Sequence, residues 1–113
     1  MAGTSARRPA LAGGPGARFV ERFQKLASAW RAETAGFSSP SRKSGHQTYL
    51  DVVGMGPDVI PLILADLRDT GGYWYPALRS LTLANPVLAE HRGDAIFMTA
   101  DWLRWDRGEG YEV

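Results

Sequence analysis

The sequence predicts an all-α fold, a compact bundle of about five short helices. Its apolar residues recur every three or four positions, the spacing that places them on one face of a helix. Short polar, Gly- or Pro-containing breaks separate these segments, and no segment shows the alternation typical of a half-buried strand. With 113 residues, 44% of them apolar, the chain is long enough for one domain with its own core. The short connections favour antiparallel packing of neighbouring helices.

The N-terminal part is expected to be a tail followed by one long helix. Residues 1–16 are rich in Gly, Ala and Pro, so we expect a disordered tail there and a single helical domain over residues 17–113. The first helix is predicted over residues 17–35, with Gly36 as its stop. The apolar stripe of this helix consists of Phe19, Phe23, Leu26 and Trp30.

The middle of the chain predicts two further helices separated by a sharp break. Residues 38–45 are polar and typical of a loop, and a short helix is expected over residues 46–53. Gly56 can cap the next helix and Pro57 can occupy its first position, where a missing N–H costs nothing. This helix is predicted to end near Arg68 and to be the most buried one, because apolar residues surround much of its circumference.

Two more helices complete the predicted bundle. A turn at residues 69–72 leads into a helix over residues 73–83, and Trp74 belongs to the inner face of that helix. Residues 85–86, Asn-Pro, end it. The last helix is expected over residues 90–107. Its apolar residues form two adjacent stripes, Ala95, Met98 and Trp102 in one and Ile96, Ala100 and Leu103 in the other.

Two of these helices resemble the helix pair of a HEAT-type repeat. Residues 56–67 contain Gly, then an apolar residue, Pro and an aliphatic run, and residues 73–81 contain an aromatic residue before Ala-Leu-x-x-Leu. The resemblance implies an antiparallel pair over Pro57–Arg68 and Tyr73–Leu83, in which each helix turns an aliphatic stripe toward the other. One such pair cannot form a solenoid, so the flanking helices are expected to cover it.

The chain also resembles a family of small, poorly characterised bacterial proteins. The shared motifs are GMGP, PLIL, a Trp-containing Ala-Leu-x-x-Leu-Thr segment, NPV and WLRW, found here at residues 54–57, 61–64, 74–82, 85–87 and 102–105. Leu83-Ala84 departs from the Gly-acid pair that usually precedes Asn-Pro in this family, a difference that concerns the local turn and not the fold. The resemblance brings no established activity. It implies a partner encoded by an adjacent gene, an arrangement similar to toxin–antitoxin or immunity pairs.

Composition and charge limit the classes of protein to consider. The absence of cysteine excludes disulfides, thiol catalysis and cysteine-held metals, and it suits the cytoplasm. No apolar run approaches the roughly 18 residues of a membrane span, so no membrane association is expected. Residues 1–50 contain eight Lys or Arg and two Glu, a net charge of +6, whereas residues 51–113 contain five Arg and ten Asp or Glu, a net charge of −5. Such asymmetry can produce a basic face that attracts an acidic partner.

Residues of catalytic type are scattered along the sequence. The two histidines, His46 and His91, are distant in sequence and lack metal-binding spacing. Ser44 is near His46, but it lies in a polar segment without a nucleophile motif. The glycines of residues 13–16 lack the preceding strand and the Lys-Ser or Lys-Thr pair of a phosphate loop. We therefore expect no enzyme, no cofactor and no metal site.

The preferred hypothesis is a protein–protein interaction module, the antitoxin-like, immunity-like or adaptor partner of a neighbouring protein. Three consecutive aromatic residues at 73–75 cannot all point inward from one helix, so some are available to a partner. The residues expected to make the contact are two aromatic side chains and three exposed acids, Tyr75, Trp105, Asp66, Asp69 and Asp106.

The alternative hypothesis is a small nucleic-acid-binding regulator that uses the basic N-terminal helix. A stripe of cations along a helix attracts phosphates. The residues expected to bind nucleic acid in this case are Arg18, Arg22, Lys25, Arg42 and Lys43.

Overall fold

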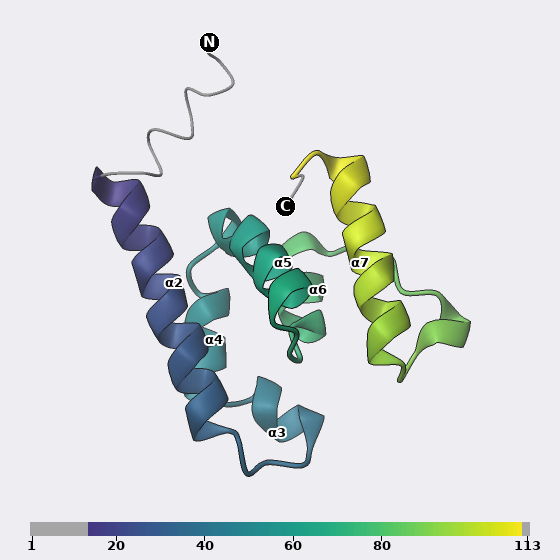
Figure 1. The fold of residues 1–113 in the computed structure, drawn as a ribbon, viewed down its shortest axis with the longest axis horizontal. Coiled ribbons are helices and arrows are strands. Elements are labelled where there is room, and N and C mark those ends of the chain that lie inside the picture. The colour runs from purple at the N-terminus through teal and green to yellow at the C-terminus, as the bar shows by residue number, and fades with distance from the viewer. Residues whose placement is uncertain (1–13, 112–113) are drawn as a thin grey trace.

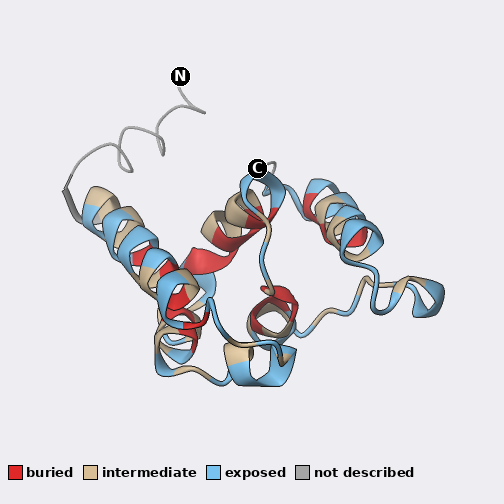
Figure 2. Cartoon of the chain, turned by 60° about the horizontal axis from the view of Figure 1, so that its bottom comes forward, coloured by how far each residue is buried: buried red, intermediate tan, exposed pale blue. Residues whose placement is uncertain are grey.

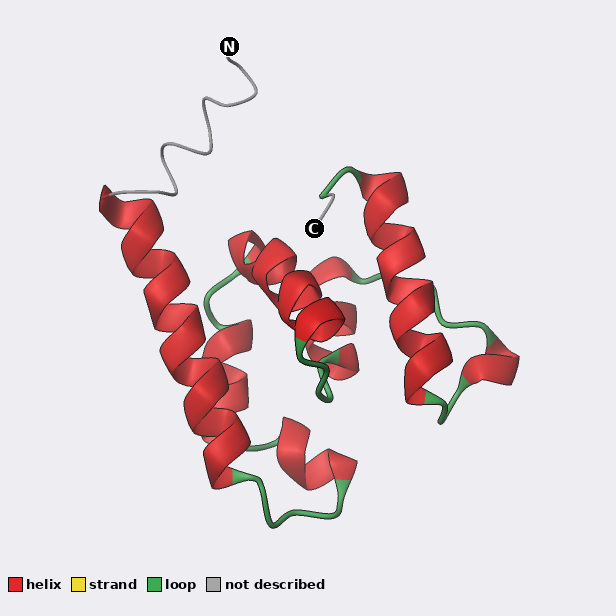
Figure 3. Ribbon diagram, in the orientation of Figure 1, coloured by secondary structure: helices red, strands yellow, loops and turns green. Residues whose placement is uncertain are grey.

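The computed structural model describes residues 14–111, which contain helices and no strand, so the predicted all-α fold is confirmed (Figures 1 and 3). The α-helices are α2 (Gly14–Glu33), α3 (Pro40–Ser44), α4 (Gln47–Val53), α5 (Ile60–Asp69), α6 (Tyr75–Thr82) and α7 (Ala95–Glu109). Two short 3-10 helices are η2 (Pro57–Val59) and η3 (Ala89–His91). Within the described residues, no helix is both long and apolar enough to cross a lipid bilayer.

The helices are arranged around α5 and α6. Helix α4 packs against α2, α6 packs against α4 and α5, and α7 packs against α5 on the side of the molecule opposite α2 (Figure 1). The buried residues lie on the inward sides of the helices, and the outward sides are exposed (Figure 2). Helix α5 contributes four buried aliphatic residues, as its sequence predicted: Ile60, Ile63, Leu64 and Leu67.

Trp74 is the centre of the core. Its fully buried ring stacks on Tyr49 at a centroid distance of 5.3 Å and contacts the rings of Trp30 at 4.6 Å and Phe23 at 5.9 Å. Offset and tilted aromatic contacts of this kind each contribute about 0.5–1.5 kcal/mol beyond the burial of area. Because these rings come from α2, α4 and the start of α6, the cluster joins three segments that are distant in sequence.

A polar network closes one side of this aromatic cluster. The Trp74 indole Nε1–H donates to Asp66 Oδ2 at 2.7 Å, and the same carboxylate forms an ion pair with Arg31. Arg31 Nη2 also donates to the carbonyl oxygen of Gly71 at 2.9 Å. Gly72, with a φ of +116°, brings the turn against Trp30 and Trp74, a backbone conformation that favours glycine. The network therefore fixes the connection between α5 and α6 to α2.

Tyr49 positions the start of α6. Its hydroxyl donates to the carbonyl oxygen of Tyr73 at 2.9 Å and accepts from the backbone N–H of Ala77 at 3.0 Å. The second bond satisfies one of the N–H groups that the first turn of a helix leaves without an intrahelical acceptor. Burial raises the pKa of the Tyr49 phenol, so it stays protonated and can serve as donor and acceptor together.

Several predicted boundaries differ in the structure, two of them because of local capping. Helix α2 begins at Gly14 rather than at residue 17, and residues 1–13 of the predicted tail lie outside the described residues. The segment predicted as a loop at 38–45 contains α3, because Ser39 caps it and a proline follows at the first helical position. The last helix begins at residue 95 rather than 90. Asp94 caps it, because its side chain accepts from the backbone N–H groups of Ile96 and Phe97.

The Trp74–Asp66 contact can be tested by a substitution that retains an aromatic ring. Trp74→Phe should lower the free energy of unfolding by about 2–3 kcal/mol, because it removes a hydrogen bond to a carboxylate and leaves a small cavity. Urea denaturation followed by circular dichroism measures the change. As a control, Ile96→Ala alters a side chain that is 80% exposed and should change stability by less than about 0.5 kcal/mol. Equal stabilities of Trp74→Phe and the wild type would contradict the assignment.

Candidate protein-interaction surface

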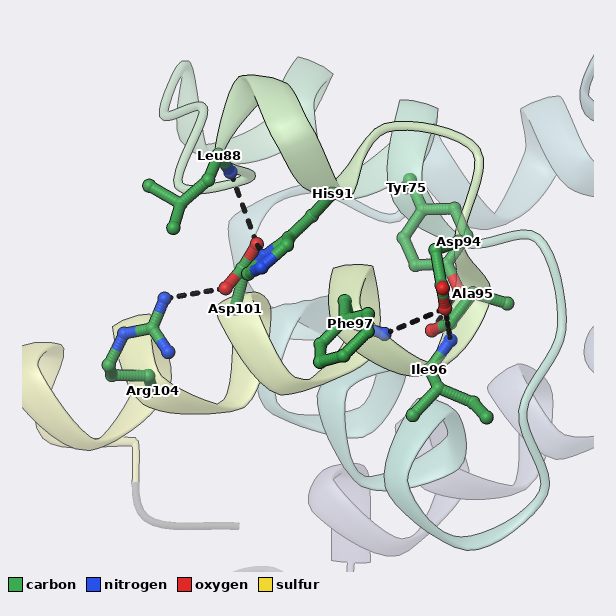
Figure 4. Close-up of polar contacts among 9 residues, drawn as sticks. All are labelled: Tyr75, Leu88, His91, Asp94, Ala95, Ile96, Phe97, Asp101 and Arg104. Carbon is green, nitrogen blue, oxygen red and sulfur yellow. Dashed lines mark hydrogen bonds and ion pairs between the residues drawn. The ribbon is translucent and has the colours of Figure 1, made fainter.

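Tyr75 is buried, which corrects the expectation that its ring is open to a partner. The residue is only 8% exposed, because α7 covers it. Its hydroxyl bonds to Thr99 Oγ1 at 3.1 Å. The same hydroxyl lies 3.3 Å from the carbonyl oxygen of Ala95, at the start of α7 (Figure 4). Tyr75 therefore joins α6 to the beginning of α7, and only its edge reaches the surface.

Of the three acids expected to be exposed, only Asp69 is. Asp69 accepts from Arg68 Nε at 2.7 Å, and this hydrogen bond lowers the pKa of the Asp69 carboxyl. Asp66 belongs to the network around Trp74 and Arg31, and Asp106 is buried on α7. The expectation of free carboxylates at Asp66 and Asp106 is therefore wrong.

Trp105 is half-buried near the C-terminal end of α7. Its ring meets the edge of Trp102 at a centroid distance of 5.4 Å and stacks on Tyr111 at 5.8 Å. Tyr75 lies against the opposite, N-terminal end of the same helix. The structure therefore does not bring the predicted partner-binding residues together in one patch.

The basic residues of the nucleic-acid alternative occupy two separate places. Arg42 and Lys43 lie on α3, beside the C-terminal end of α2 (Figure 1). The Arg42 guanidinium covers the ring of Phe37 at 4.7 Å, and the Lys43 carbonyl accepts from the Trp30 indole at 2.8 Å. The other three basic residues are exposed on α2, with an acid among them, in the order Arg18, Glu21, Arg22 and Lys25.

A different surface, over α6 and the start of α7, combines exposed apolar groups with free cations. It includes a hollow of about 420 Å³ that we call the arginine hollow. Arg79 and Arg92 line it, and within the described residues neither guanidinium has an ion pair or hydrogen bond. No acid lines the hollow. Its other principal lining residues are Tyr73, Asn85, Met98 and Trp102.

A second, less polar hollow adjoins the first. This apolar hollow has a volume of about 510 Å³ and shares Tyr73 and Tyr75 with the arginine hollow. Ile96 lies on its wall and is largely exposed, although the sequence placed it on an apolar stripe of the last helix. Helix α7 starts at Ala95, directly after its cap Asp94, so Ile96 lies in the first turn, where its side chain is exposed (Figure 4).

Leu83 combines exposure with an unfavourable backbone conformation. It ends α6 with φ 60° and ψ 13°, the left-handed region, where its N–H donates to the carbonyl oxygen of Arg79 at 2.8 Å. The residue is 89% exposed. It shares a shallow depression with Pro76 and Arg79, which also line the arginine hollow, so Leu83 continues the same surface. A non-glycine residue in this conformation costs about 1–2 kcal/mol, and here no burial of the side chain offsets it.

A buried carboxylate anchors the segment that supplies Arg92. Asp101 on α7 is almost fully buried and accepts from His91 Nδ1 at 2.7 Å, from the Leu88 backbone N–H at 3.1 Å and from Arg104 (Figure 4). Burial opposes ionisation, but the three hydrogen bonds outweigh it and lower the pKa of Asp101 to about 2. The imidazole of His91 also stacks on Phe97 at 4.7 Å. These contacts hold residues 88–91 against α7 and so place Arg92 at the hollow.

The His91–Asp101 pair has the arrangement that orients a catalytic base in serine hydrolases. Catalysis of that kind also needs a hydroxyl or thiol hydrogen-bonded to the second imidazole nitrogen. Within residues 14–111, no Ser or Thr hydroxyl bonds to His91, and no group of three potential metal ligands comes together. In the described part of the chain, the contacts of this pair are those that hold residues 88–91 against α7.

Comparison with known proteins adds no assignment: no protein-family model, no curated protein and no solved structure matches the chain.

The sequence does not point to the residues of the surface over α6 and α7, and the reason differs between the arginines and Leu83. Arg79 and Arg92 are single cations in ordinary helix and loop contexts, without any motif. Leu83 gave a readable signal, since it stands where a helix stops and glycine is the usual residue.

The Asp101 anchor predicts a specific acid dependence of stability. Because the pKa of the folded carboxyl is about 2, below its ordinary 3.8, the stabilisation is complete above about pH 4 and is lost as the pH falls toward 2. Asp101→Asn should be less stable than the wild type at pH 7 and lose less stability between pH 4 and pH 2. Urea titrations across this range measure both effects. Asp58→Asn, at an exposed carboxylate, is the control, and parallel curves for Asp101→Asn and wild type would refute the assignment.

The strained backbone of Leu83 predicts that replacing this residue with glycine stabilises the fold. Leu83→Gly should raise the free energy of unfolding by about 0.5–1 kcal/mol, since glycine adopts the left-handed region without penalty. Leu50→Gly is the matched control, because Leu50 is also exposed but lies inside α4 in the ordinary helical conformation. The control should lose about 1 kcal/mol or more. Changes of the same sign in the two variants, measured by denaturant unfolding, would contradict the strain.

Proposed function

We propose that the protein is a protein–protein interaction module, without catalysis of its own, that binds a partner through the surface over α6 and the start of α7. The observation that carries the proposal is Leu83, which is 89% exposed in a strained conformation, in a depression that adjoins the arginine hollow. A strained backbone conformation at an exposed residue persists more readily where that residue has a use. An exposed apolar anchor next to pockets is the usual centre of a binding hot spot.

The composition of the same surface supports this proposal. Ile96 is a second exposed aliphatic residue, at the other end of the surface from Leu83. Tyr73 lies between the two hollows, and arginines line one of them. Tyrosine and arginine are enriched in the energetically important parts of protein interfaces, and a polar rim around apolar anchors is typical of them.

The partner we propose is a neighbouring gene's product, which this chain would neutralise or adapt, in the manner of antitoxin or immunity proteins and in the cytoplasm of a bacterium. This part of the proposal rests on the resemblance of motifs such as residues 54–57 and 102–105 to a small bacterial family. The mechanism requires only binding. Occupation of the partner's functional surface by Leu83 and its surroundings would suffice to block or redirect it.

The proposal is tested by capture with a variant that leaves the fold intact. The tagged chain, expressed in its native host, should retain a partner protein, and Leu83→Gly should lose it although that variant is expected to be the more stable one. The captured protein is identified by mass spectrometry, purified and recombined with each chain in a calorimetric titration. We expect truncation of this anchor to weaken binding at least tenfold, since hot-spot residues contribute 2 kcal/mol or more.

Leu50→Gly is the control, since it changes an exposed leucine on α4, outside the proposed surface. It should bind the partner like the wild type at a temperature at which it is folded. A wild-type chain that is recovered alone and monomeric under mild conditions would overturn the proposed function.

A further inference from the structure

We propose that the arginine hollow binds a carboxylate next to an apolar side chain in the partner protein, with Arg79 and Arg92 holding the carboxylate. The inference rests on the proposed module function and adds the chemistry of the partner's binding segment. Such a segment is an acidic residue, or a chain terminus, beside an aromatic or aliphatic residue.

The charge of the hollow is the first support. Two guanidinium groups, those of Arg79 and Arg92, line it without any acid among the lining residues. Neither group has a hydrogen bond or ion pair within the described residues, so their donors are available. Guanidinium donors match the geometry of a carboxylate and can bind it through two parallel hydrogen bonds.

The remaining lining provides a place for an apolar side chain. Tyr73, Met98 and Val87 line the same hollow as the arginines. A thioether and an aromatic face adapt to aliphatic or aromatic groups. The hollow therefore combines cations with apolar contacts, whereas a site for a free inorganic anion needs only the former.

Trp102 supplies a further part of the lining. It lines the hollow, is fully buried, and its indole Nε1–H has no hydrogen-bond acceptor within the described residues. Because this nitrogen is itself inaccessible to solvent, Trp102 contributes a buried wall of the hollow, and its indole signal reports occupation of the hollow.

The distribution of charge favours a carboxylate-bearing protein over a nucleic acid. A nucleic-acid site uses a track of cations along the phosphate backbone. The other free basic stripe, that of Arg18, Arg22 and Lys25, lies on α2, across the molecule from α7 (Figure 1). Two isolated arginines are sufficient for one carboxylate but do not form such a track.

The proposal is tested with a small carboxylate probe and its neutral counterpart. N-acetylphenylalanine and N-acetylphenylalaninamide are titrated into the full ¹⁵N-labelled chain, and the NMR signals of the Trp102 indole and the arginine Nε–H groups are followed. The carboxylate should shift these signals and bind at least about tenfold more tightly than the amide, since a charged hydrogen bond contributes about 1.5–3 kcal/mol. Equal affinities of the two probes would overturn the proposal.

Variants assign the binding to the two arginines. Arg79→Gln and Arg92→Gln should each weaken the binding of N-acetylphenylalanine about tenfold. Both residues are exposed, so the variants should fold like the wild type. Arg107→Gln is the control, because it removes an exposed arginine on α7 that does not line the hollow. Unchanged affinity in both hollow variants would also overturn the proposal.

Capture of the protein partner separates this inference from the module function. If Leu83→Gly loses the partner and the Arg79→Gln, Arg92→Gln double variant loses it as well, both proposals are supported. If only Leu83→Gly loses it, the module function stands and the carboxylate inference fails. If no partner is captured, the module function fails. The proposal that a segment of a partner protein occupies the hollow then fails with it, even if the carboxylate probe binds.

Discussion

The hydrogen bond between the Trp74 indole and the Asp66 carboxylate is the contact on which the other parts of the structure depend. Asp66 is in turn paired with Arg31, so one carboxylate joins α2, α5 and the turn before α6. A carboxylate in a largely apolar setting is stable only when its charge and its lone pairs are satisfied. Because both partners contact this carboxylate, they favour the conformation of the α5–α6 turn that brings Trp74 into the aromatic cluster. The direction of α6, and with it the walls of both hollows, follows from that turn.

How far the sequence predicts the structure depends on the range of the interactions involved. The stripe that includes Phe23 and Trp30, the buried α5 and the inward Trp74 follow from local periodicity, and all are confirmed. Composition predicts a loop where α3 lies and a start near residue 90 for α7, although Ser39 and Asp94 are residue types that cap helices. These errors are local and correctable from sequence alone.

The candidate site is different, because its residues depend on contacts between distant segments. Asp66 looks like a solvent-facing acid at a helix end, and only the fold shows that Arg31, 35 positions earlier, reaches it. Asp101 is likewise buried by a segment that returns from the preceding loop to bond through His91. Conversely, nothing in the sequence near Arg79 indicates that its guanidinium has no ion pair or hydrogen bond within the described residues. Two acids that the sequence predicted to be exposed, Asp66 and Asp106, are used in the fold, whereas Arg79, which no motif marks, lines the hollow.

The buried contacts that stabilise the fold also set the positions of the residues that line the arginine hollow. Asp101 holds the loop that contributes Arg92, and Tyr75 holds α7 against α6, so both sides of the arginine hollow are fixed by buried polar bonds rather than by the surface itself. A preformed site loses less conformational entropy on binding than a flexible one. Leu83 then stands at the edge of a rigid frame, where its strain cannot relax without breaking the end of α6. Folding alone would not select an exposed leucine in a strained backbone conformation, which is the reason for proposing that Leu83 serves recognition.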